Sequence, residues 1–408
     1  MSRIVLGVSG GIAAYKACEV LRGLTESGHE VTVVPTEAAL NFVGASTWSA
    51  LSGRQVHTGV FDDTHLVNHV RLGQQADLVL VVPATADLLA RAAIGRADDL
   101  LTNVLLTTHA PVLLCPAMHT EMWQHAATAA NVATLRDRGV VVLDPADGRL
   151  TGADSGPGRL PDPAEVLAVA GALLDEPAVA TAASRRDLSG RVVAISAGGT
   201  REALDPVRYL GNASSGRMGI ALARAAALRG ATVRLVAGHV DVSPPSGVDV
   251  TAVSSTSDLH RAMTTAARDA DVVVMAVAAA DFTPVAPSDT KLRKSGDDGL
   301  RLEFRQTVDV LRTLAAERSR PDQLVVGFAA ETPAPDGPDL VAAGRQKLRR
   351  KGCDLIVVND VSAGSVFGAH DNAVTLVDAE TASGPHSGAK ESLAHRIWDH
   401  IGGMLPTS

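Results

Sequence analysis

The sequence is poor in cysteine, in surplus positive charge and in long apolar runs, and each shortage excludes a class of protein. Cys18, Cys115 and Cys353 lie far apart in 408 residues, which fits a reducing compartment and excludes a disulfide framework. With 37 basic and 45 acidic residues, the net charge of −8 disfavours a general nucleic-acid binder. The most apolar stretch, residues 272–280, is about half as long as a membrane span, and no signal-peptide pattern is visible. We therefore expect a cytoplasmic protein without nucleic-acid or membrane partners.

What the sequence does contain is short apolar runs that alternate with Ala- and Leu-rich helical stretches. Runs that are apolar on both faces are typical of buried parallel strands, so the alternation predicts a doubly wound α/β fold. In the first half, strands are expected at 3–8, 30–34, 77–82, 111–115 and 140–143. Helices are expected there at 11–27, 86–108, 119–138 and 163–174. In the second half, strands are expected at 191–196, 232–236, 271–277, 323–328 and 354–358.

Between the two series, residues 175–190 carry Pro, Ser and charge, a composition typical of a linker. We predict two Rossmann-like domains, residues 1–180 and 191–408, joined by a linker at 181–190. The second series opens with Arg191-Val-Val-Ala-Ile-Ser-Ala-Gly-Gly-Thr, which is similar to Arg3-Ile-Val-Leu-Gly-Val-Ser-Gly-Gly-Ile in the first. Each domain is therefore able to host a nucleotide-like ligand.

Two glycine-rich segments come before predicted helices. Gly7-Val-Ser-Gly-Gly lacks the G-x-G-x-x-G spacing, and no acidic residue ends the second strand, so a mononucleotide with one phosphate is favoured over NAD. Gly211-Asn-Ala-Ser-Ser-Gly has the glycine spacing of a P-loop, but Arg217 and Met218 replace the Lys and Ser/Thr of a Walker A motif. A tight turn without a ligand explains the first segment equally well, and ordinary N-capping by Ser explains the second.

Two further spacings have competing interpretations. His65 and His69 are four residues apart on an expected helix, but Leu66 replaces the Glu of H-E-x-x-H, which favours a solvated or core pair over zinc. His69 is also a candidate general base, because it precedes a buried strand. Lys347 and Lys351 share one helix face and could clamp a triphosphate, although periodicity alone predicts a solvated basic face.

Longer motifs occur in a fixed order in both halves. Those of the first half are Ser9-Gly-Gly-Ile-Ala-Ala-Tyr-Lys, Asn68-His-Val-Arg-Leu, Pro83-Ala-Thr-Ala-Asp, Pro116-Ala-Met-His-Thr-Glu-Met-Trp and Gly156-Pro-Gly-Arg. Those of the second are Ala197-Gly-Gly-Thr-Arg-Glu, Asp205-Pro-Val-Arg-Tyr, Asn212-Ala-Ser-Ser-Gly-Arg-Met-Gly, Ala279-Ala-Asp, Lys291-Leu-Arg-Lys, Val326-Gly-Phe-Ala-Ala-Glu-Thr and Val358-Asn-Asp-Val. In this order they resemble the bifunctional family of coenzyme A biosynthesis in which a phosphopantothenoylcysteine decarboxylase is fused to a phosphopantothenate–cysteine ligase.

For the first half, the resemblance implies a flavodoxin-like domain that binds FMN and decarboxylates phosphopantothenoylcysteine to 4′-phosphopantetheine. His69 matches the family's base, and the implied FMN-binding residues are Ser9, Gly10, Gly11, Thr36, Ala84 and Thr85. Met118 and His119 match the substrate-binding segment, although the family usually has Asn where this chain has His119. The family's proton-donating Cys would fall at Gly152, so the chain lacks that donor.

For the second half, the resemblance implies a CTP- and Mg²⁺-dependent ligase that joins 4′-phosphopantothenate to cysteine through an acyl-cytidylate. Lys291 and Asn212 match catalytic positions, Arg208 and Asn212 match substrate contacts, and Asp281 is the expected metal ligand. The expected CTP-binding residues are Asp281, Lys291, Thr307, Val308, Asp309, Val310, Phe328, Lys347 and Lys351. Thr307-Val308 stands where the family usually has Asn-Pro.

The resemblance also implies homo-oligomers, with trimers of the flavin domain that assemble further and dimers of the ligase domain. The FMN site would then lie between subunits. Two alternatives remain beside the bifunctional enzyme. One is a ligase with an inert flavin domain, and the other is a flavin-binding regulatory protein.

Overall fold

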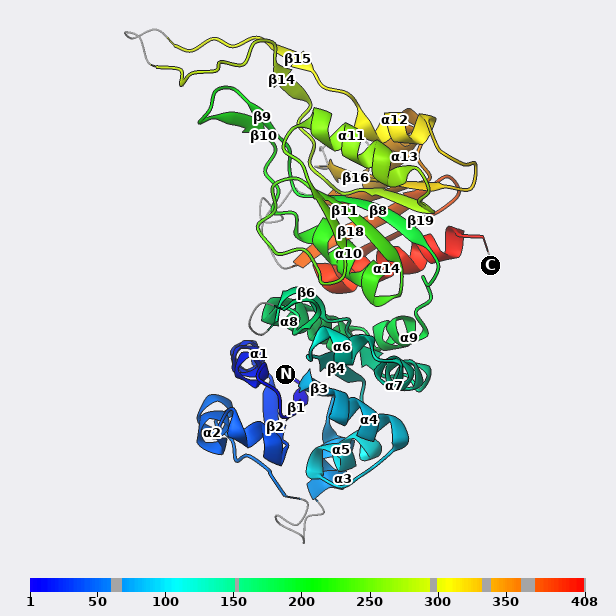
Figure 1. Cartoon of the computed structure of the whole chain (residues 1–408). Helices are drawn as coiled ribbons and strands as arrows, with labels where there is room; N and C mark the ends of the chain where they lie inside the picture. Colours follow the sequence, from blue (N-terminus) through cyan, green and yellow to red (C-terminus); the bar gives the residue numbers. More distant parts are fainter. Residues whose placement is uncertain (60–67, 151–153, 294–298, 332–338, 361–370, 407–408) are drawn as a thin grey trace. The chain divides into compact units, whose positions relative to one another are not determined.

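The structure, a computed structural model, describes residues 1–59, 68–150, 154–293, 299–331, 339–360 and 371–406. The chain forms two compact units, unit 1 at residues 1–187 and unit 2 at residues 188–408 (Figure 1). Helix α9 (Pro177–Arg185) occupies part of the segment expected to be a linker. Its alanine-rich sequence has high helix propensity, and Pro177 in the first turn is compatible with a helix start.

Unit 1 is built on one parallel sheet with the strand order β2-β1-β3-β4-β5. This is the flavodoxin-like order, in which ligands bind at the carboxyl ends of β1 and β3, where the order reverses. The strands are β1 (Arg3–Val8), β2 (Glu30–Pro35), β3 (Leu78–Ala84), β4 (Val112–Pro116) and β5 (Val141–Val142). Every residue of β3 is buried, as expected for the central strand of a sheet covered on both faces.

Helices cover both faces of this sheet, and an antiparallel hairpin, β6 (Ala146–Arg149) and β7 (Ser155–Arg159), follows β5. The longer helices are α1 (Ala14–Glu26), α4 (Ala86–Ile94), α7 (Ala126–Asp137) and α8 (Pro163–Asp175). The shorter elements are η1 (Glu37–Asn41), α2 (Ala45–Ser52), α3 (Asn68–Gln75), α5 (Leu100–Thr107) and α6 (Thr120–Gln124).

Unit 2 contains an eight-stranded sheet with the order β12-β11-β8-β13-β16-β17-β18-β19. Its first six strands are parallel and follow the Rossmann order 3-2-1-4-5-6, whereas β18 and β19 are antiparallel additions. The parallel strands are β8 (Val192–Ala197), β11 (Thr232–Ala237), β12 (Asp249–Ala252), β13 (Val272–Met275), β16 (Leu324–Glu331) and β17 (Leu355–Asp360). The additions are β18 (Asp371–Asp378) and β19 (Ala382–Ala389).

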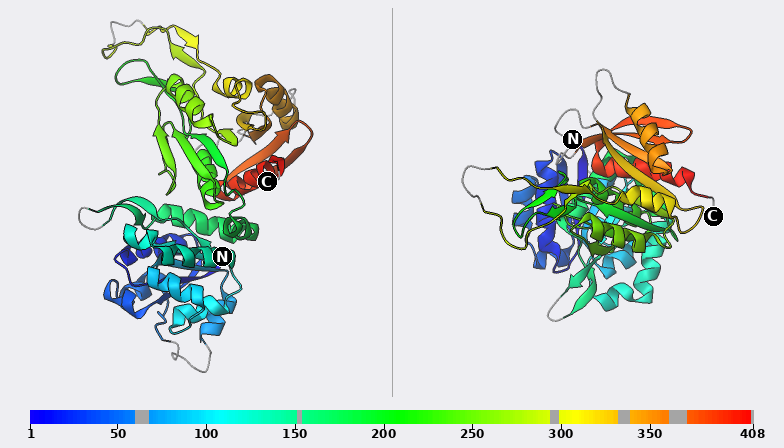
Figure 2. Two further views of the ribbon diagram at one scale, coloured as in Figure 1. Left: turned by 45° about the vertical axis from the view of Figure 1, so that its right-hand side comes forward. Right: turned by 90° about the horizontal axis from the view of Figure 1, so that it is seen from above.

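The two faces of the unit 2 sheet are covered by different sets of helices (Figure 1). On one face lie α10 (Arg217–Leu228) and α14 (Lys390–Met404). On the other lie α11 (Thr256–Ala267), α12 (Val310–Ala316) and α13 (Leu340–Lys351). Two short hairpins, β9 (Arg201–Ala203) with β10 (Tyr209–Gly211) and β14 (Phe282–Pro284) with β15 (Phe304–Gln306), extend from one end of the unit (Figures 1 and 2).

The predicted α/β class and all ten predicted strands are confirmed, with ends that differ by a few residues. Two predicted helices are each divided in the structure. The stretch 86–108 is interrupted because Gly95 ends α4 in the left-handed conformation and Asp99 caps α5. The stretch 119–138 is interrupted at His125, which is extended and caps α7. Among the described residues no single helix has the length and apolar character of a membrane span, although α8 and α9, bent by 117°, satisfy that test as a pair.

Candidate active sites

The glycine-rich turn after β1 is joined to the end of β3 through the hydroxyl of Ser9. Ser9 Oγ donates to the Pro83 carbonyl oxygen at 2.7 Å and accepts from the Thr85 N–H at 2.9 Å. The side chain is almost completely buried. Ser9 therefore positions the two loops of the switch point relative to each other, and its part in FMN binding stays a prediction.

The residues around this turn leave hydrogen-bond donors for an anion. Ala13 is the N-cap of α1 and has no side chain that could cap the helix. The Ala14 and Lys16 N–H groups already donate to the Gly11 and Ala13 carbonyl oxygens, at 2.9 and 3.0 Å, so only part of the first turn is left for a ligand. Thr36 and Thr85 each accept a bond from the helix they cap, which leaves the O–H proton of each to donate. A Cβ on Gly10 would lie 2.4 Å from Ala38 Cβ, so glycine is required there for packing against η1. This donor set fits a phosphate group.

The segment Met118–His119 lies directly under the β6–β7 hairpin. The Met118 N–H donates to the Gly158 carbonyl oxygen at 2.9 Å, and a Cβ on Gly158 would lie 2.2 Å from Met118 O. His119 is exposed, and the Thr120 hydroxyl is buried without a hydrogen-bond partner among the described residues. The hairpin can therefore act as a cover over the two predicted substrate residues. Gly152, where the family's Cys would fall, lies outside the described residues.

His69 lies away from these groups in the same chain. It is in the first turn of α3, and its carbonyl oxygen accepts from the Thr107 hydroxyl at 3.0 Å. Thr107 ends α5, and the chain then enters the amino end of β4. His69 therefore lies near the amino ends of the strands, whereas Ser9 and Thr85 lie at the carboxyl ends. Its Nδ1 is buried without a partner among the described residues. His65, its predicted helix neighbour, lies outside the described residues.

None of the three cysteines is an activated thiol. Burial raises the pKa of the Cys115 thiol well above its usual range, with a smaller contribution from Glu165, although Cys115 directly precedes Pro116 and Met118. Burial also raises the pKa of Cys353, to about 11, and that of Cys18. Cys115 and Cys353 are also buried, so neither thiol is exposed to donate a proton to a ligand.

In unit 2, a buried threonine network joins the loops at the carboxyl ends of β8 and β13. Thr200 and Thr256 share a hydrogen bond of 3.0 Å between their hydroxyls, and Thr200 Oγ1 accepts from the Ala280 N–H at 2.8 Å. The hydroxyls of Thr256 and Thr307 both donate to the Ala280 carbonyl oxygen, at 3.2 and 2.7 Å. This network holds Asp281, the next residue, at the switch point of the sheet.

A cavity of about 920 Å³, the carboxyl-edge pocket, opens beside Asp281. Most of the predicted ligase residues line it: Asn212, Asp281, Thr307, Val308, Asp309, Val310, Phe328, Lys347 and Lys351. Asn212 Nδ2 donates to the Ala279 carbonyl oxygen at 2.8 Å, which fixes its amide at the wall. The side chain of Val310 is buried in the core and contributes little surface.

Lys347 and Lys351 share one face of α13, as predicted, but carboxylates already engage both. Lys347 Nζ lies 3.5 Å from Glu331 Oε1, and Lys351 Nζ lies 2.5 Å from Asp309 Oδ2. Burial would raise the pKa of Asp309, but its hydrogen bond with Lys351 and the Arg312 N–H outweigh burial and lower that pKa. A ligand phosphate would have to compete with these carboxylates.

Arg208 and Lys291 are brought together, but not at this pocket. Arg208 Nη2 donates to the Leu292 carbonyl oxygen at 2.7 Å, and the Leu292 N–H donates to Asp205 Oδ2 at 3.1 Å. Asp205 also accepts the N–H groups of Val207 and Arg208, at 2.7 Å each. Neither Arg208 nor Lys291 lines the carboxyl-edge pocket. The structure thus divides the predicted ligase residues into a pocket set and a hairpin set.

Comparison with known proteins identifies the chain. Residues 188–404 match the family model described as DNA/pantothenate metabolism flavoprotein C-terminal domain, and residues 1–174 match the flavoprotein model. The coenzyme A biosynthesis bifunctional protein CoaBC of Mycolicibacterium smegmatis is 53% identical over 411 residues, which cover 99% of this chain and 98% of the relative. The chain belongs to the bifunctional coenzyme A biosynthesis family.

The family resemblance read from the motifs is thereby confirmed, and the chain is a bifunctional flavoprotein enzyme with decarboxylase and ligase activities. Two solved structures are also similar. The C-terminal domain of a CoaBC protein is 32% identical with a TM-score of 0.45, covering 54% of this chain and 97% of its own. A PPC decarboxylase mutant complexed with pantothenoylaminoethenethiol is 25% identical with a TM-score of 0.40, covering 43% of this chain and 100% of its own. Unit 1 is from here on the flavoprotein unit, and unit 2 the ligase unit.

The ligase unit fits a metal held mainly by its substrate. Among the described residues, no group of three or more His, Cys, Asp or Glu side chains could hold an ion. Mg²⁺ is commonly bound by one or two carboxylates together with substrate phosphates, and the exposed Asp281 supplies one carboxylate at the pocket.

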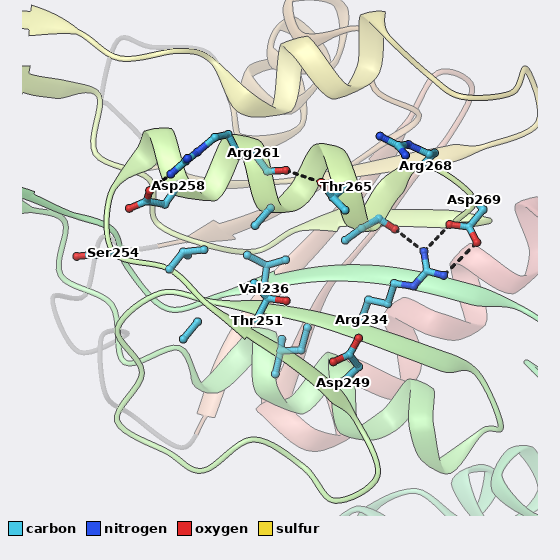
Figure 3. Close-up of a pocket in the computed structure, with 15 residues that line it drawn as sticks. Arg234, Val236, Asp249, Thr251, Ser254, Asp258, Arg261, Thr265, Arg268 and Asp269 are labelled. Atoms are coloured by element: carbon cyan, nitrogen blue, oxygen red, sulfur yellow. Dashed lines mark hydrogen bonds and ion pairs between the residues drawn. The ribbon is translucent and has the colours of Figure 1, made fainter.

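A second cavity of the ligase unit, between the β11–β12 edge and α11, contains none of the predicted site residues (Figure 3). Its charged groups are largely paired with one another. Arg234 binds both carboxylate oxygens of Asp269, at 2.5 and 3.0 Å, and Arg261 pairs with Asp258. Mutual pairing leaves this cavity without a clear preference for a charged ligand.

Sequence reasoning did not assign Arg217, Asn372 or Lys390 to a site, although all of them line the carboxyl-edge pocket. Asn372 Nδ2 donates to Asn359 Oδ1 at 3.2 Å, so the two amides form one wall. Arg217 was noted only because it departs from a Walker A motif. Arg217 and Lys390 are the first residues of α10 and α14, where the helix dipole disfavours a basic side chain. A basic residue at the start of a predicted helix is the signal that could have pointed to them in the sequence.

Proposed function

We propose that the ligase unit joins 4′-phosphopantothenate to cysteine with CTP and Mg²⁺ in two steps. A carboxylate oxygen of 4′-phosphopantothenate attacks the α-phosphorus of CTP, the bond to the bridging oxygen breaks, and pyrophosphate leaves. The cysteine amine then attacks the acyl carbon, CMP leaves with the bonding electrons, and the amine loses a proton. The observation that carries this proposal is the convergence of nine predicted residues on the carboxyl-edge pocket. The three free cysteines fit a cytoplasmic site for the reaction.

Within this pocket, the residues have separate roles. Asp281 would hold Mg²⁺, which neutralises charge on the triphosphate when bound. The Asn212 amide, held by the Ala279 carbonyl, can direct its second N–H to the acyl phosphate. Phe328 offers an aromatic face to the base, and Lys347 and Lys351 flank it from α13.

We propose that Arg208 and Lys291 complete this pocket from a second copy of the chain. The hairpins that carry them expose apolar side chains, including Val207 at 61%, Tyr209 at 51% and Leu300 at 59%. Exposed apolar patches of this kind mark interaction surfaces. A ligase dimer formed through the hairpins would cover these side chains and bring two cations to the substrate.

In the flavoprotein unit, we propose that FMN binds with its phosphate at the N-terminus of α1 and at the hydroxyls of Thr36 and Thr85. When bound, FMN supplies a reversible two-electron oxidation of the cysteinyl thiol, after which the carboxylate is lost easily as CO₂. Gly10 and Gly11 are half-buried at this turn, Ala84 is buried beside it, and Ser9 holds the two loops together. Met118 and His119, under the β6–β7 hairpin, would contact the substrate carboxylate.

We propose that His69 removes the thiol proton in the FMN site of a neighbouring subunit. Within one chain it lies near the opposite sheet edge, and its Nδ1 has no partner among the described residues. Apolar side chains are exposed near both regions, with Leu106 at 57% beside Thr107 and Ile12 at 68% beside the glycine turn. An assembly that buries these surfaces fits the trimers expected for this domain.

The test of the overall function is incubation of the full chain with 4′-phosphopantothenate, cysteine and CTP, with products identified by mass. Both activities predict 4′-phosphopantetheine, CO₂, CMP and pyrophosphate. Accumulation of phosphopantothenoylcysteine alone would identify a ligase with an inert flavin unit. No conversion, with FMN still bound, would support a regulatory protein.

The shared flavin site has its own test. His69→Asn and Thr85→Arg chains, each inactive as decarboxylases, are mixed, dissociated and reassembled. If a site combines His69 of one subunit with Thr85 of another, hybrids regain part of the CO₂ release. Absence of recovery in confirmed hybrids would place both residues in one chain's site.

A further inference from the structure

The hydroxyls of Thr200 and Thr256 form a closed hydrogen-bond ring with both backbone groups of Ala280. The Ala280 N–H donates to Thr200 Oγ1 at 2.8 Å, Thr256 Oγ1 donates to the Ala280 carbonyl oxygen at 3.2 Å, and the two hydroxyl oxygens are 3.0 Å apart. Each hydroxyl has one proton, and that of Thr256 goes to Ala280, so Thr200 donates the bond between them. Every bond of this ring then runs in the same direction, an arrangement in which neighbouring hydrogen bonds strengthen one another.

The two threonines of the ring do not contact a ligand in the carboxyl-edge pocket. Both are only 1% exposed, and neither lines the pocket. The backbone N–H of Thr256, the first residue of α11, donates to Glu202 Oε1 at 2.7 Å, and that of Thr200 donates to the Ala278 carbonyl oxygen at 3.2 Å. Their polar groups are directed to the chain itself, so any effect on a ligand must pass through another residue.

The residue that follows Ala280 is Asp281, whose backbone is fixed on both sides. Asn212 Nδ2 donates to the Ala279 carbonyl oxygen at 2.8 Å, and the Thr307 N–H donates to the Asp281 carbonyl oxygen at 3.0 Å. The Asp281 side chain, in contrast, is exposed at the pocket and forms no hydrogen bond or ion pair with the other described residues. The backbone alone therefore sets the direction from which this carboxylate enters the pocket.

We infer that Thr200 and Thr256 are positioning residues that direct the Asp281 carboxylate toward the metal-bound triphosphate. This inference rests on the proposed ligase function. Mg²⁺ requires nearly ideal octahedral geometry, so a small rotation of the peptide before Asp281 should weaken its binding. Valine at position 256 would keep the shape of threonine without the hydroxyl. It would leave the Thr200 proton without an acceptor and open the ring.

The test measures CTP binding to the full chain by calorimetry, once in Mg²⁺ and once in EDTA. We expect Thr256→Val to weaken binding about tenfold in Mg²⁺ and less than about twofold in EDTA, because only the metal-bound nucleotide uses the Asp281 carboxylate. Thr256→Ser keeps the hydroxyl and should regain most of the affinity. Thr375→Val removes a buried threonine hydroxyl of β18 outside the pocket, and this matched control should bind CTP as tightly as the wild type.

A double variant separates positioning from a general loss of structure. Asp281→Asn removes the carboxylate charge, so adding Thr256→Val to it should weaken CTP binding further by less than about twofold, whereas independent effects would multiply. Multiplied losses, equal losses in Mg²⁺ and EDTA, or unchanged binding in Thr256→Val would each overturn the inference. If Thr256→Val does not fold, Thr200→Val opens the same ring and is compared instead. If the variants show the expected pattern but the wild type cannot ligate with CTP, the proposed function is contradicted and the positioning role stands.

Discussion

The flavoprotein and ligase units both carry glycine-rich turns at the carboxyl edge of a parallel sheet, yet they assemble their predicted residues differently. In the ligase unit, a buried threonine network ties three loops together, and nine predicted residues line one pocket. In the flavoprotein unit, Ser9, Thr36 and Thr85 gather at the switch point, while His69 lies near the other edge of the sheet. With a similar sheet topology, the ligase unit therefore brings together most of its predicted site residues. The flavoprotein unit brings together only those predicted to bind the cofactor.

This difference indicates which of the two reactions depends more on an oligomer. On the functions proposed above, the ligase pocket would receive two hairpin cations from a second copy, whereas the flavoprotein unit would receive its general base. We therefore expect disruption of assembly to affect CO₂ release more severely than nucleotide binding.

The largest effect is expected from His69→Asn. Loss of a general base typically reduces the rate by about 10²–10⁴-fold, and no other titratable group is known to occupy its place. CO₂ release from supplied phosphopantothenoylcysteine is followed in one assay, and CTP-dependent ligation in a second. Ligation should stay at the wild-type rate, and parallel loss of both rates would show that the two units do not function independently.

Gly158→Ala should open the cover of the flavoprotein site. Gly158 has a φ of +148°, and a Cβ there would lie 2.2 Å from Met118 O, so the hairpin must move. Such backbone strain costs on the order of 1–3 kcal/mol; if the cost falls on the closed hairpin, it corresponds to about a fivefold to 160-fold loss of decarboxylation. Gly171→Ala, whose Cβ would meet no atom within 4 Å, is the control. Equal rates for the two variants would exclude a role for hairpin closure.

Acid should destabilise the ligase unit through His395. Burial, with a smaller contribution from Arg229, lowers the pKa of His395 to about 3, so the folded unit keeps it neutral. The unfolded chain protonates it below a pKa of about 6.5, so stability is lost as the pH falls from about 6.5 toward 3, by about 2 kcal/mol at pH 5.

This acid effect is measured by urea unfolding at several pH values, with exposure of Cys353 reporting on the ligase unit. His395→Leu should flatten the pH dependence between pH 7 and pH 5, because the variant has no imidazole to protonate. A pH dependence as steep as that of the wild type would contradict the assignment to His395.

The smallest effect is expected from His119→Asn. Both side chains can donate a hydrogen bond to a substrate carboxylate, so the KM for phosphopantothenoylcysteine should change by less than about threefold. His119→Ala leaves that carboxylate without a donor and should raise KM by about tenfold. Equal KM values for the Asn and Ala variants would show that this position does not contact the carboxylate.

Strands and their order of appearance could be predicted because each is a short run that is apolar on both faces. The hairpins β9–β10 and β14–β15 could not, since strands of three residues such as Phe304–Gln306 leave no periodic signal. β19 was missed for a related reason, because Ala382–Ala389 is an exposed edge strand with polar residues and a proline.

The sequence indicates which side chains lie together where a motif stays near its strand, and it does not where the side chains come from distant elements. Asp281 lies six residues beyond the end of β13 at Met275, so a place near the carboxyl edge could be expected from the strand. Lys390 reaches the same pocket from the last helix, more than 100 residues later in the chain. Ser9 stays a predicted FMN-binding residue, but the sequence did not indicate that its buried hydroxyl bonds to the Pro83 carbonyl oxygen and the Thr85 N–H.

The two hydrogen bonds of the Ser9 hydroxyl also affect how the flavoprotein unit binds its cofactor. Because one buried hydroxyl joins the β1 turn to the β3 loop, the entrance keeps its shape before any ligand arrives. FMN should then associate in a single kinetic phase that is linear in concentration, with little change in helix content. Ser9→Ala removes both hydrogen bonds. It should introduce a slow phase whose rate does not depend on FMN concentration, because the two loops would then order only after FMN has bound.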